Sequence, residues 1–398
     1  MGAALSMLLM TGCVATAATS QVVPAADEVS SRTVSSRTVP SPTVPSPTVE
    51  AALARRGQAV LAHDGGAVAA TQAPGATAGV RALTSRVAAL PLTVWTYVIE
   101  TSQAGPSGAQ RTVTAVLHYR LPADPTDVTA RRRIVLAWSG GWRVVSDVPV
   151  GAALPWDLGL AHWAAGAQSE VVSVATAVDL RASGDQAARE VSAVWGTRWR
   201  RVPVLVAVAG AGELAALTGR TPAGVGDLVA LATADRVYVD VAAYLSLDPA
   251  GRQVLISHEV THLATAAGAD RASPQWLKEG FADYVGFLQS AIPVGQAAAV
   301  LLARVRAQGP PPALPDDAAF GPAAVAGVQA QAYAGAWLLC TLIAWTDGQG
   351  ALVAVYRATA AGTGSERQDV DAALTRVTGR SLAWWTAAWR QDLTVLAA

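Results

Sequence analysis

The chain is short of cysteine, lysine and net charge, and the low cysteine count and the zero net charge each exclude a class of protein. Its 398 residues include two cysteines, Cys13 and Cys340. They form no C-x-x-C pair, which excludes a cysteine-based zinc or redox site. The 29 basic and 29 acidic residues cancel, and no run of like charge stands out, so no nucleic-acid binding is predicted. Lys278 is the single lysine, which we interpret as an effect of GC-rich coding, as in actinobacteria.

Long apolar runs are also missing. No stretch of 18 or more residues has membrane-spanning character, so no internal membrane helix is predicted. Hydrophobic residues nevertheless make up 52% of the chain and charged residues 15%, which is ample material for a buried core.

The N-terminal segment has a short apolar stretch, AALSMLLM at residues 3–10, followed by Thr11, Gly12 and Cys13. This resembles the end of a bacterial lipoprotein signal. The resemblance implies a signal segment over 1–20, lipidation of Cys13 and a membrane partner through that anchor. It also implies a place in the cell envelope, on the outer face of the cytoplasmic membrane, or secretion. Met10 and the missing basic residues depart from the usual pattern. The alternative is an apolar N-terminus with an incidental cysteine.

A pentapeptide repeat follows, reading SSRTV, SSRTV, PSPTV, PSPTV over residues 30–49. Proline and hydroxyl residues without bulky apolar groups cannot bury a core. The repeat predicts a disordered linker over 21–50, which would tether a domain to a lipid at Cys13.

Residues 51–152 predict a small α+β domain. Residues 51–88 have a helical pattern. Four runs rich in Val, Trp, Tyr and Thr follow. Residues alternate within each run, and Gly and Pro separate the runs, as in an antiparallel meander. The pattern looks like an NTF2-like α+β domain.

Residues 153–398 predict a second domain with an α/β part over 153–268 and a helical part over 269–398. The strands expected in the α/β part are 202–210 and 236–241. A helix is expected to begin at Asp248-Pro249, where Asp caps and Pro suits the first position, and to stop at Gly268.

The run SHEVTHLATA, at 257–266, places His258 and His262 around Glu259. Chance would produce H-E-x-x-H in roughly one of a thousand sequences of this composition. Residues i and i+4 share a helix face, so both imidazoles can reach one zinc ion. Glu259 is one residue further round the helix, so it cannot easily bind the same ion but can reach a water bound to that ion. The third ligand must come from another segment, with Glu279 as the obvious candidate. The alternative is two ordinary histidines on a helix.

HEVTH followed by WLKEGFADY, at 276–284, resembles the gluzincin branch of zinc metallopeptidases. This branch includes thermolysin-like enzymes, aminopeptidase N relatives and peptidase MA-like proteins. The resemblance implies a zincin-type catalytic domain and a peptide or protein substrate. One Zn²⁺ would be held by His258, His262 and Glu279, with Glu259 as the general base. It further implies that Asp283 hydrogen-bonds a ligand histidine, although Asp283 on a solvated face is the alternative.

Two further assignments are looser. The run 331–345 resembles the downstream helix of peptidase MA-like proteins, which implies that Tyr333 stabilises the oxyanion; the alternative is a core tyrosine. The G-x-M-E-N motif of aminopeptidase N relatives is missing before the zinc helix. We therefore predict that strand 236–241, with Val237 and Val239, is the edge on which an extended peptide pairs.

Two alternatives to a peptidase remain. One is a zinc-binding but catalytically silent envelope lipoprotein that acts as a binding module through its N-terminal domain. Retention of Glu259 argues against it, since a structural metal site does not need that carboxylate. The other is a structural lipoprotein without metal.

Overall fold

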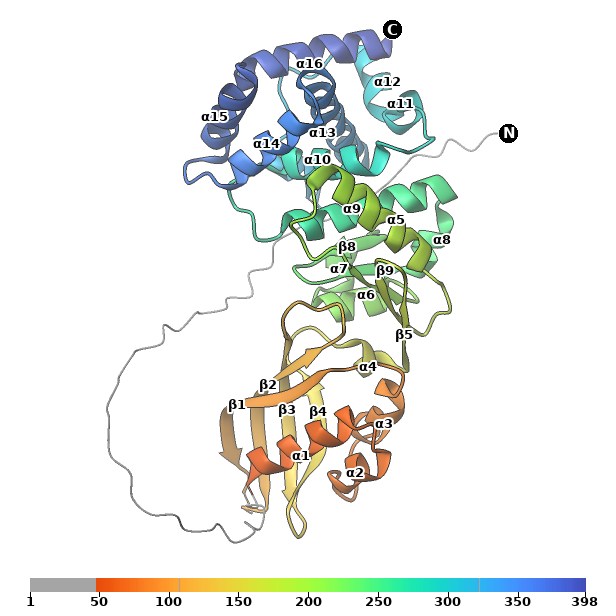
Figure 1. Cartoon of the computed structure of the whole chain (residues 1–398), viewed down its shortest axis with the longest axis vertical. Helices are drawn as coiled ribbons and strands as arrows, with labels where there is room; N and C mark the ends of the chain where they lie inside the picture. Colours follow the sequence, from red (N-terminus) through yellow and green to blue (C-terminus); the bar gives the residue numbers. More distant parts are fainter. Residues whose placement is uncertain (1–47, 107, 322) are drawn as a thin grey trace.

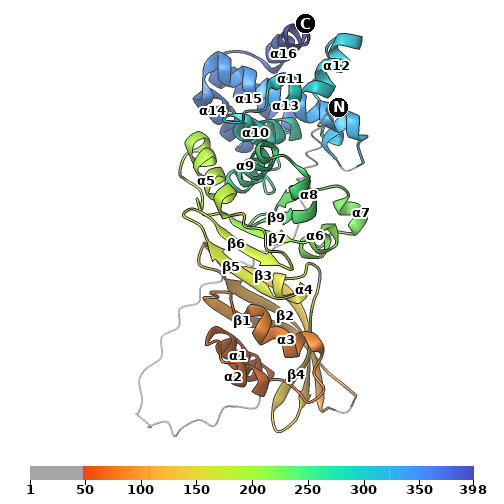
Figure 2. The ribbon, with the colours of Figure 1, turned by 90° about the vertical axis from the view of Figure 1, so that its right-hand side faces the viewer.

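The computed structural model describes residues 48–106, 108–321 and 323–398. Three parts follow one another along the long axis of the molecule, a first α+β domain, a central five-stranded sheet and a helical part (Figures 1 and 2). Cys13, the predicted signal segment 1–20 and the linker up to residue 47 lie outside the described residues. Helix α1 begins at Val49, inside the last residues of the range predicted as linker.

The first domain confirms the predicted order of helices followed by an antiparallel meander. Its sheet has the order β1-β2-β3-β4 with every pair antiparallel. Along β2 every second side chain is buried, as expected for a sheet with one face on a core. The likeness to NTF2-like domains stays a prediction. The elements are α1 (Val49–Leu61), α2 (Gly65–Ala70), α3 (Ala78–Val87), β1 (Val94–Ala104), β2 (Gln110–Arg120), β3 (Val128–Trp138) and β4 (Trp142–Pro149).

The central sheet has five strands in the order β5-β6-β7-β9-β8. Strands β6, β7 and β9 are parallel, and β5 and β8 pair antiparallel at the two sides. The strands are β5 (Ala161–Ala165), β6 (Glu170–Val174), β7 (Val204–Val208), β8 (Ala230–Ala232) and β9 (Val237–Asp240). The helices of this part are α4 (Pro155–Leu158), α5 (Arg181–Trp195), α6 (Ala211–Thr218), α7 (Pro222–Val225) and α8 (Val241–Ser246).

Both faces of the central sheet are buried, which explains why β7 reads as a continuous apolar run. Leu205 and Ala207 belong to the core shared with the helical part. Val204 and Val206 belong to a core that also contains Tyr119 of the first domain. The first domain therefore packs directly on the sheet that supports the helical part.

The prediction that Val237 and Val239 form a substrate edge is wrong. Both lie in β9, which is hydrogen-bonded to β7 on one side and to β8 on the other. Their side chains are completely buried. The outermost strand on this side, among the described residues, is β8. Because β8 has three residues, its sequence shows no alternation. The sequence pattern therefore indicated the longer neighbouring strand, β9, as the edge.

The helical part confirms the prediction of helices after Asp248. Trp385 and Trp389 are among the largest fully buried side chains of its core. None of the described helices combines the length and apolar character needed to cross a bilayer. The helices are α9 (Pro249–Thr265), α10 (Gln275–Phe287), α11 (Val294–Ala297), α12 (Ala299–Gln308), the 3-10 turn η1 (Asp317–Phe320), α13 (Ala326–Asp347), α14 (Gln349–Ala360), α15 (Glu366–Thr378) and α16 (Leu382–Ala397).

Helix α9 begins where the sequence predicts, because Asp248 Oδ1 accepts a hydrogen bond from the Gly251 amide at 2.9 Å. It ends earlier than predicted. Ala266 adopts the left-handed conformation, with φ of 54°, and its N–H bonds to the carbonyl of His262. The chain therefore leaves the helix two residues before Gly268.

Replacing Asp248 tests this cap. We expect Asp248→Ala to lower the free energy of unfolding by about 1 kcal/mol, because the Gly251 amide loses its acceptor. Asp248→Asn keeps a side-chain oxygen at the same place and is the matched control. Denaturant titration of the three proteins measures the effect; equal stability of the alanine and asparagine variants would contradict it.

Candidate metal centre

Helix α9 places His258 and His262 in the interior of the protein. Their exposed fractions are 0% and 3%. The spacing of four residues puts both imidazoles on one face of the helix. The two Nε2 atoms lie 2.9 Å apart.

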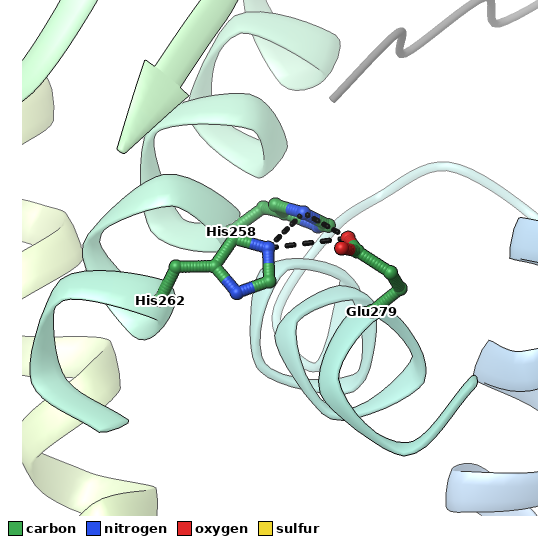
Figure 3. A group of neighbouring side chains, drawn as sticks. All are labelled: His258, His262 and Glu279. Carbon is green, nitrogen blue, oxygen red and sulfur yellow. Dashed lines mark hydrogen bonds and ion pairs between the residues drawn. The ribbon is translucent and has the colours of Figure 1, made fainter. Parts of the chain in front are cut away.

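Helix α10 brings Glu279 to the same point, as the sequence predicts. Glu279 Oε2 lies 3.2 Å from the Nε2 atoms of both His258 and His262. Figure 3 shows the two imidazoles and the carboxylate turned toward one another from the two helices. Each residue offers one ligand atom, and these atoms lie within 4.8 Å of one another. The structure thus brings together the three predicted metal-binding residues.

Two glycines of α10 allow its neighbours to approach this closely. A Cβ on Gly280 would lie 2.4 Å from the carbonyl oxygen of Ala336 in α13. A Cβ on Gly286 would lie 2.8 Å from the carbonyl oxygen of Val254 in α9. Since real Cβ atoms do not approach oxygen so closely, both positions require glycine. The glycine that follows Glu279 therefore sets the depth at which α10 presents the carboxylate.

Asp283, one helical turn beyond Glu279, supports His258. Its Oδ1 lies 2.8 Å from Nδ1 of His258, and both side chains are buried. A hydrogen bond from Nδ1–H to this carboxylate leaves the Nε2 lone pair directed at the centre. The alternative of Asp283 on a solvated face is wrong, because α10 is buried there on all sides.

Glu259 is held by the edge strand of the central sheet. Its Oε2 accepts a hydrogen bond of 2.6 Å from the main-chain N–H of Ala232, in β8. Its Oε1 is buried and has no hydrogen-bond partner among the described residues. Such an orphaned carboxylate oxygen is costly to bury and indicates a missing partner, such as a water molecule.

The electrostatics of the cluster favour a cation. Burial alone would raise the pKa of Glu279, but His262 and His258 lower it to about 2. Burial alone would lower the pKa of His258, but the carboxylates of Asp283 and Glu279 raise it well above its ordinary value. For Glu259, burial raises the pKa despite the two imidazoles. Three carboxyl groups thus lie with two imidazoles away from water, and the positive charge of the imidazoles favours the ionised form of Glu279.

The donor set and its spacing fit a metal ion. Two imidazoles and one carboxylate are the ligands of many zinc sites. Bonds of 2.0–2.1 Å in a tetrahedral arrangement separate ligand atoms by about 3.4 Å. The observed separations of 2.9, 3.2 and 3.2 Å are slightly shorter, so small side-chain rotations would admit an ion.

The remaining predicted residues are placed as follows. Tyr333, in α13, is buried, and its ring centre lies 6.4 Å from that of His258. It also packs edge-on against Phe320 at 5.2 Å. Tyr333 therefore lies beside the centre, which is compatible with both the oxyanion role and the core role. Cys340 is a free, buried cysteine that belongs to the apolar core of the helical part, as a small hydrophobic residue would.

Sequence reasoning missed the contribution of β8. The donor to Glu259 is a main-chain amide, and any residue at position 232 except proline could supply it. The strand is three residues long, too short for a periodic pattern. Its one local signal is the Thr233–Arg236 turn, in which Thr233 Oγ1 donates to Asp235 Oδ1 at 2.9 Å.

The chain was compared with known proteins. No protein-family model matches it, and no curated protein does. Similar solved structures include an M1 zinc metallopeptidase mutant from Deinococcus radiodurans bound to a Tyr-Ser-Ala substrate. That structure is 16% identical, with a TM-score of 0.38, and the match covers 66% of this chain and 58% of that chain.

Two more of these structures are M1 zinc metallopeptidase mutants. A two-domain mutant bound to L-arginine is 16% identical with a TM-score of 0.36, over 66% of this chain and 58% of that one. A mutant from Deinococcus radiodurans is 16% identical with a TM-score of 0.35, over 77% and 61%. The match spans about six tenths of the length of these structures. At such low scores the likeness alone establishes neither fold nor activity.

Gly280 offers a test of the close helix contact. We expect Gly280→Ala to lower the free energy of unfolding by about 1–3 kcal/mol, because the added methyl group pushes α10 away from α13. Gly212, in α6, has open space around it, so Gly212→Ala is the matched control and should be neutral or stabilising. Thermal and denaturant unfolding measure both. Equal effects of the two substitutions would contradict the packing role of Gly280.

Proposed function

We propose that this chain is a zinc-dependent peptidase that hydrolyses peptide bonds in a peptide or protein substrate. The proposal is carried by one observation: a buried convergence of His258, His262 and Glu279 beside a carboxylate, Glu259, that keeps one oxygen unpartnered. A purely structural metal site would not need the fourth group. Three protein ligands also leave a coordination position open.

His258, His262 and Glu279 would hold the ion, and Asp283 would fix the ring of His258. When bound, zinc supplies a Lewis acid that polarises a carbonyl oxygen and lowers the pKa of a bound water to about 7.

Glu259 is the proposed general base. The Ala232 amide fixes its Oε2, which leaves Oε1 to take a proton from the attacking water. The same carboxyl group then gives that proton to the leaving amine. Tyr333, beside His258, is the proposed donor to the developing oxyanion.

The substrate is proposed to pair with β8 in place of the rejected strand. Asp240 N–H bonds to the carbonyl of Val229, and Thr233 N–H bonds to that of Arg236. Because bonded pairs alternate in an antiparallel ladder, the polar main-chain groups of Ala230 and Ala232 face away from β9. The Ala232 N–H is taken by Glu259, so an extended peptide would add to this side through the main-chain groups of Ala230 and the carbonyl of Ala232. The proposed envelope location and the lipid anchor at Cys13 rest on the sequence alone.

The general base is tested by Glu259→Gln in the full chain. We expect kcat/KM for a mixed peptide library to fall by at least about 100-fold, because the amide cannot accept the proton. Bound zinc, measured by elemental analysis, should stay at about one per chain in both proteins, since Glu259 is not a ligand.

His262→Ala is the contrasting variant and should lose both zinc and activity. Zinc in wild type and Glu259→Gln without cleavage by either would favour the catalytically silent binding protein. An absence of zinc in all of them, even after reconstitution, would reject the metal site.

Asp283 is expected to tune the metal affinity. Asp283→Ala should weaken zinc binding by about 10- to 100-fold, because His258 loses the acceptor that orients its ring. Asp283→Asn keeps an acceptor oxygen and should lose less. Competition with a chromogenic chelator measures the affinities, and unchanged binding in the alanine variant would contradict the role of Asp283.

A further inference from the structure

A loop of the first domain enters the second domain at the turn of the β8–β9 hairpin. The loop follows β2 and carries Asp124, whose side chain is completely buried. Arg236, the residue before β9, is 1% exposed. Its Nη1 and Nη2 donate to Asp124 Oδ1 and Oδ2 at 2.8 and 3.0 Å. The two domains are thus joined by a bidentate ion pair, which fixes both distance and orientation.

A second arginine ties the main chain of the turn to the same carboxylate. Arg200 Nη1 donates to the carbonyl of Asp235 at 2.6 Å. Its Nη2 lies 3.5 Å from Asp124 Oδ1 and 3.5 Å from the carbonyl of Ala123. The turn of the hairpin is therefore held on both sides by groups that converge on Asp124.

The same hairpin carries the amide that holds Glu259. Within the turn, Thr233 N–H bonds to the carbonyl of Arg236 at 2.8 Å. The residue before Thr233 is Ala232, which donates to Glu259 Oε2. The contacts form a continuous path from Asp124 through Arg236 and the turn to the proposed general base.

We propose that Asp124 of the first domain is a positioning residue for Glu259, acting through Arg236 and the β8–β9 hairpin. The inference rests on the proposed function, in which Glu259 takes a proton. Burying an ion pair gains little stability over apolar packing, so the pair is better explained by the geometry that it fixes. The first domain is then part of the working enzyme and not a spacer.

The test compares Asp124→Asn with a matched control in the full chain. Asp157 also receives a bidentate contact from a buried arginine, Arg132, at 2.6 and 2.9 Å. It lies in α4, and its side-chain hydrogen bonds go to Arg132 and to the Leu154 amide, so Asp157→Asn breaks a similar pair outside the hydrogen-bonded path from Asp124 to Glu259. Arg236→Lys, which keeps the charge and loses the fork, is the second variant should Asp124→Asn not fold.

Two quantities are measured. Hydrogen exchange of the amides in 229–236 should speed up in Asp124→Asn and Arg236→Lys, with exchange in β7 unchanged. kcat should fall by at least about tenfold with zinc content unchanged, because a displaced base loses catalytic geometry. Asp157→Asn should match the wild type in both respects.

The inference is overturned if the amides of 229–236 exchange at the wild-type rate in both hairpin variants. It is also overturned if exchange speeds up throughout the protein, or if Asp157→Asn changes exchange and kcat as much as the hairpin variants do. If the wild type cleaves nothing, the proposed function fails. The exchange result still decides separately whether Asp124 holds the hairpin against Glu259.

Discussion

The architecture depends on placing two imidazoles and a carboxylate about 3 Å apart inside the protein. Polar groups buried in this way are costly unless each has a partner. The helices that carry them must therefore be fixed to within a fraction of an ångström. Glycine at positions 280 and 286 lets α10 reach the main chains of α13 and α9, and Asp283 orients the ring of His258. The close packing of α9, α10 and α13 therefore also fixes the distances between the two imidazoles and the carboxylate.

The central sheet also holds Glu259, whose Oε2 accepts a hydrogen bond from the Ala232 amide in β8. Strand β8 has three residues, so its ladder to β9 contains few hydrogen bonds. The turn is fixed instead by Arg236 and Arg200, whose contacts end on Asp124. An apolar core shared by the first domain and the sheet supports the same junction. Ion pairs and apolar packing thus both join the first domain to the sheet that holds Glu259.

The alternation of strand side chains has a consequence for the whole molecule. Successive residues of β7 serve two different cores, one toward the helical part and one toward the first domain. A sheet buried on both faces is apolar in every position, and its sequence gives no sign of which neighbour lies on which side. The sequence therefore does not predict the contact between the first domain and the sheet.

Local chemistry allowed much to be predicted from the sequence. The start of α9 at Asp248, the meander of the first domain and the shared helix face of His258 and His262 follow from capping, alternation and helical spacing. The choice of Glu279 followed from the resemblance of the WLKEG run to a known motif, and the contact with α13 explains the glycine of that run. Lipidation at Cys13 and the roles of Glu259 and Tyr333 remain predictions.

Tertiary structure alone decided the rest. The order of the strands placed Val237 and Val239 inside the sheet and left β8 outermost, because register and neighbours depend on contacts distant in the chain. The hold of Ala232 on Glu259 is a main-chain contact, which no side-chain pattern encodes. The pairing of Asp124 with Arg236 spans 112 residues, and single charged residues in loops do not identify their partners. Sequence determined which groups are present, and packing determined which of them meet.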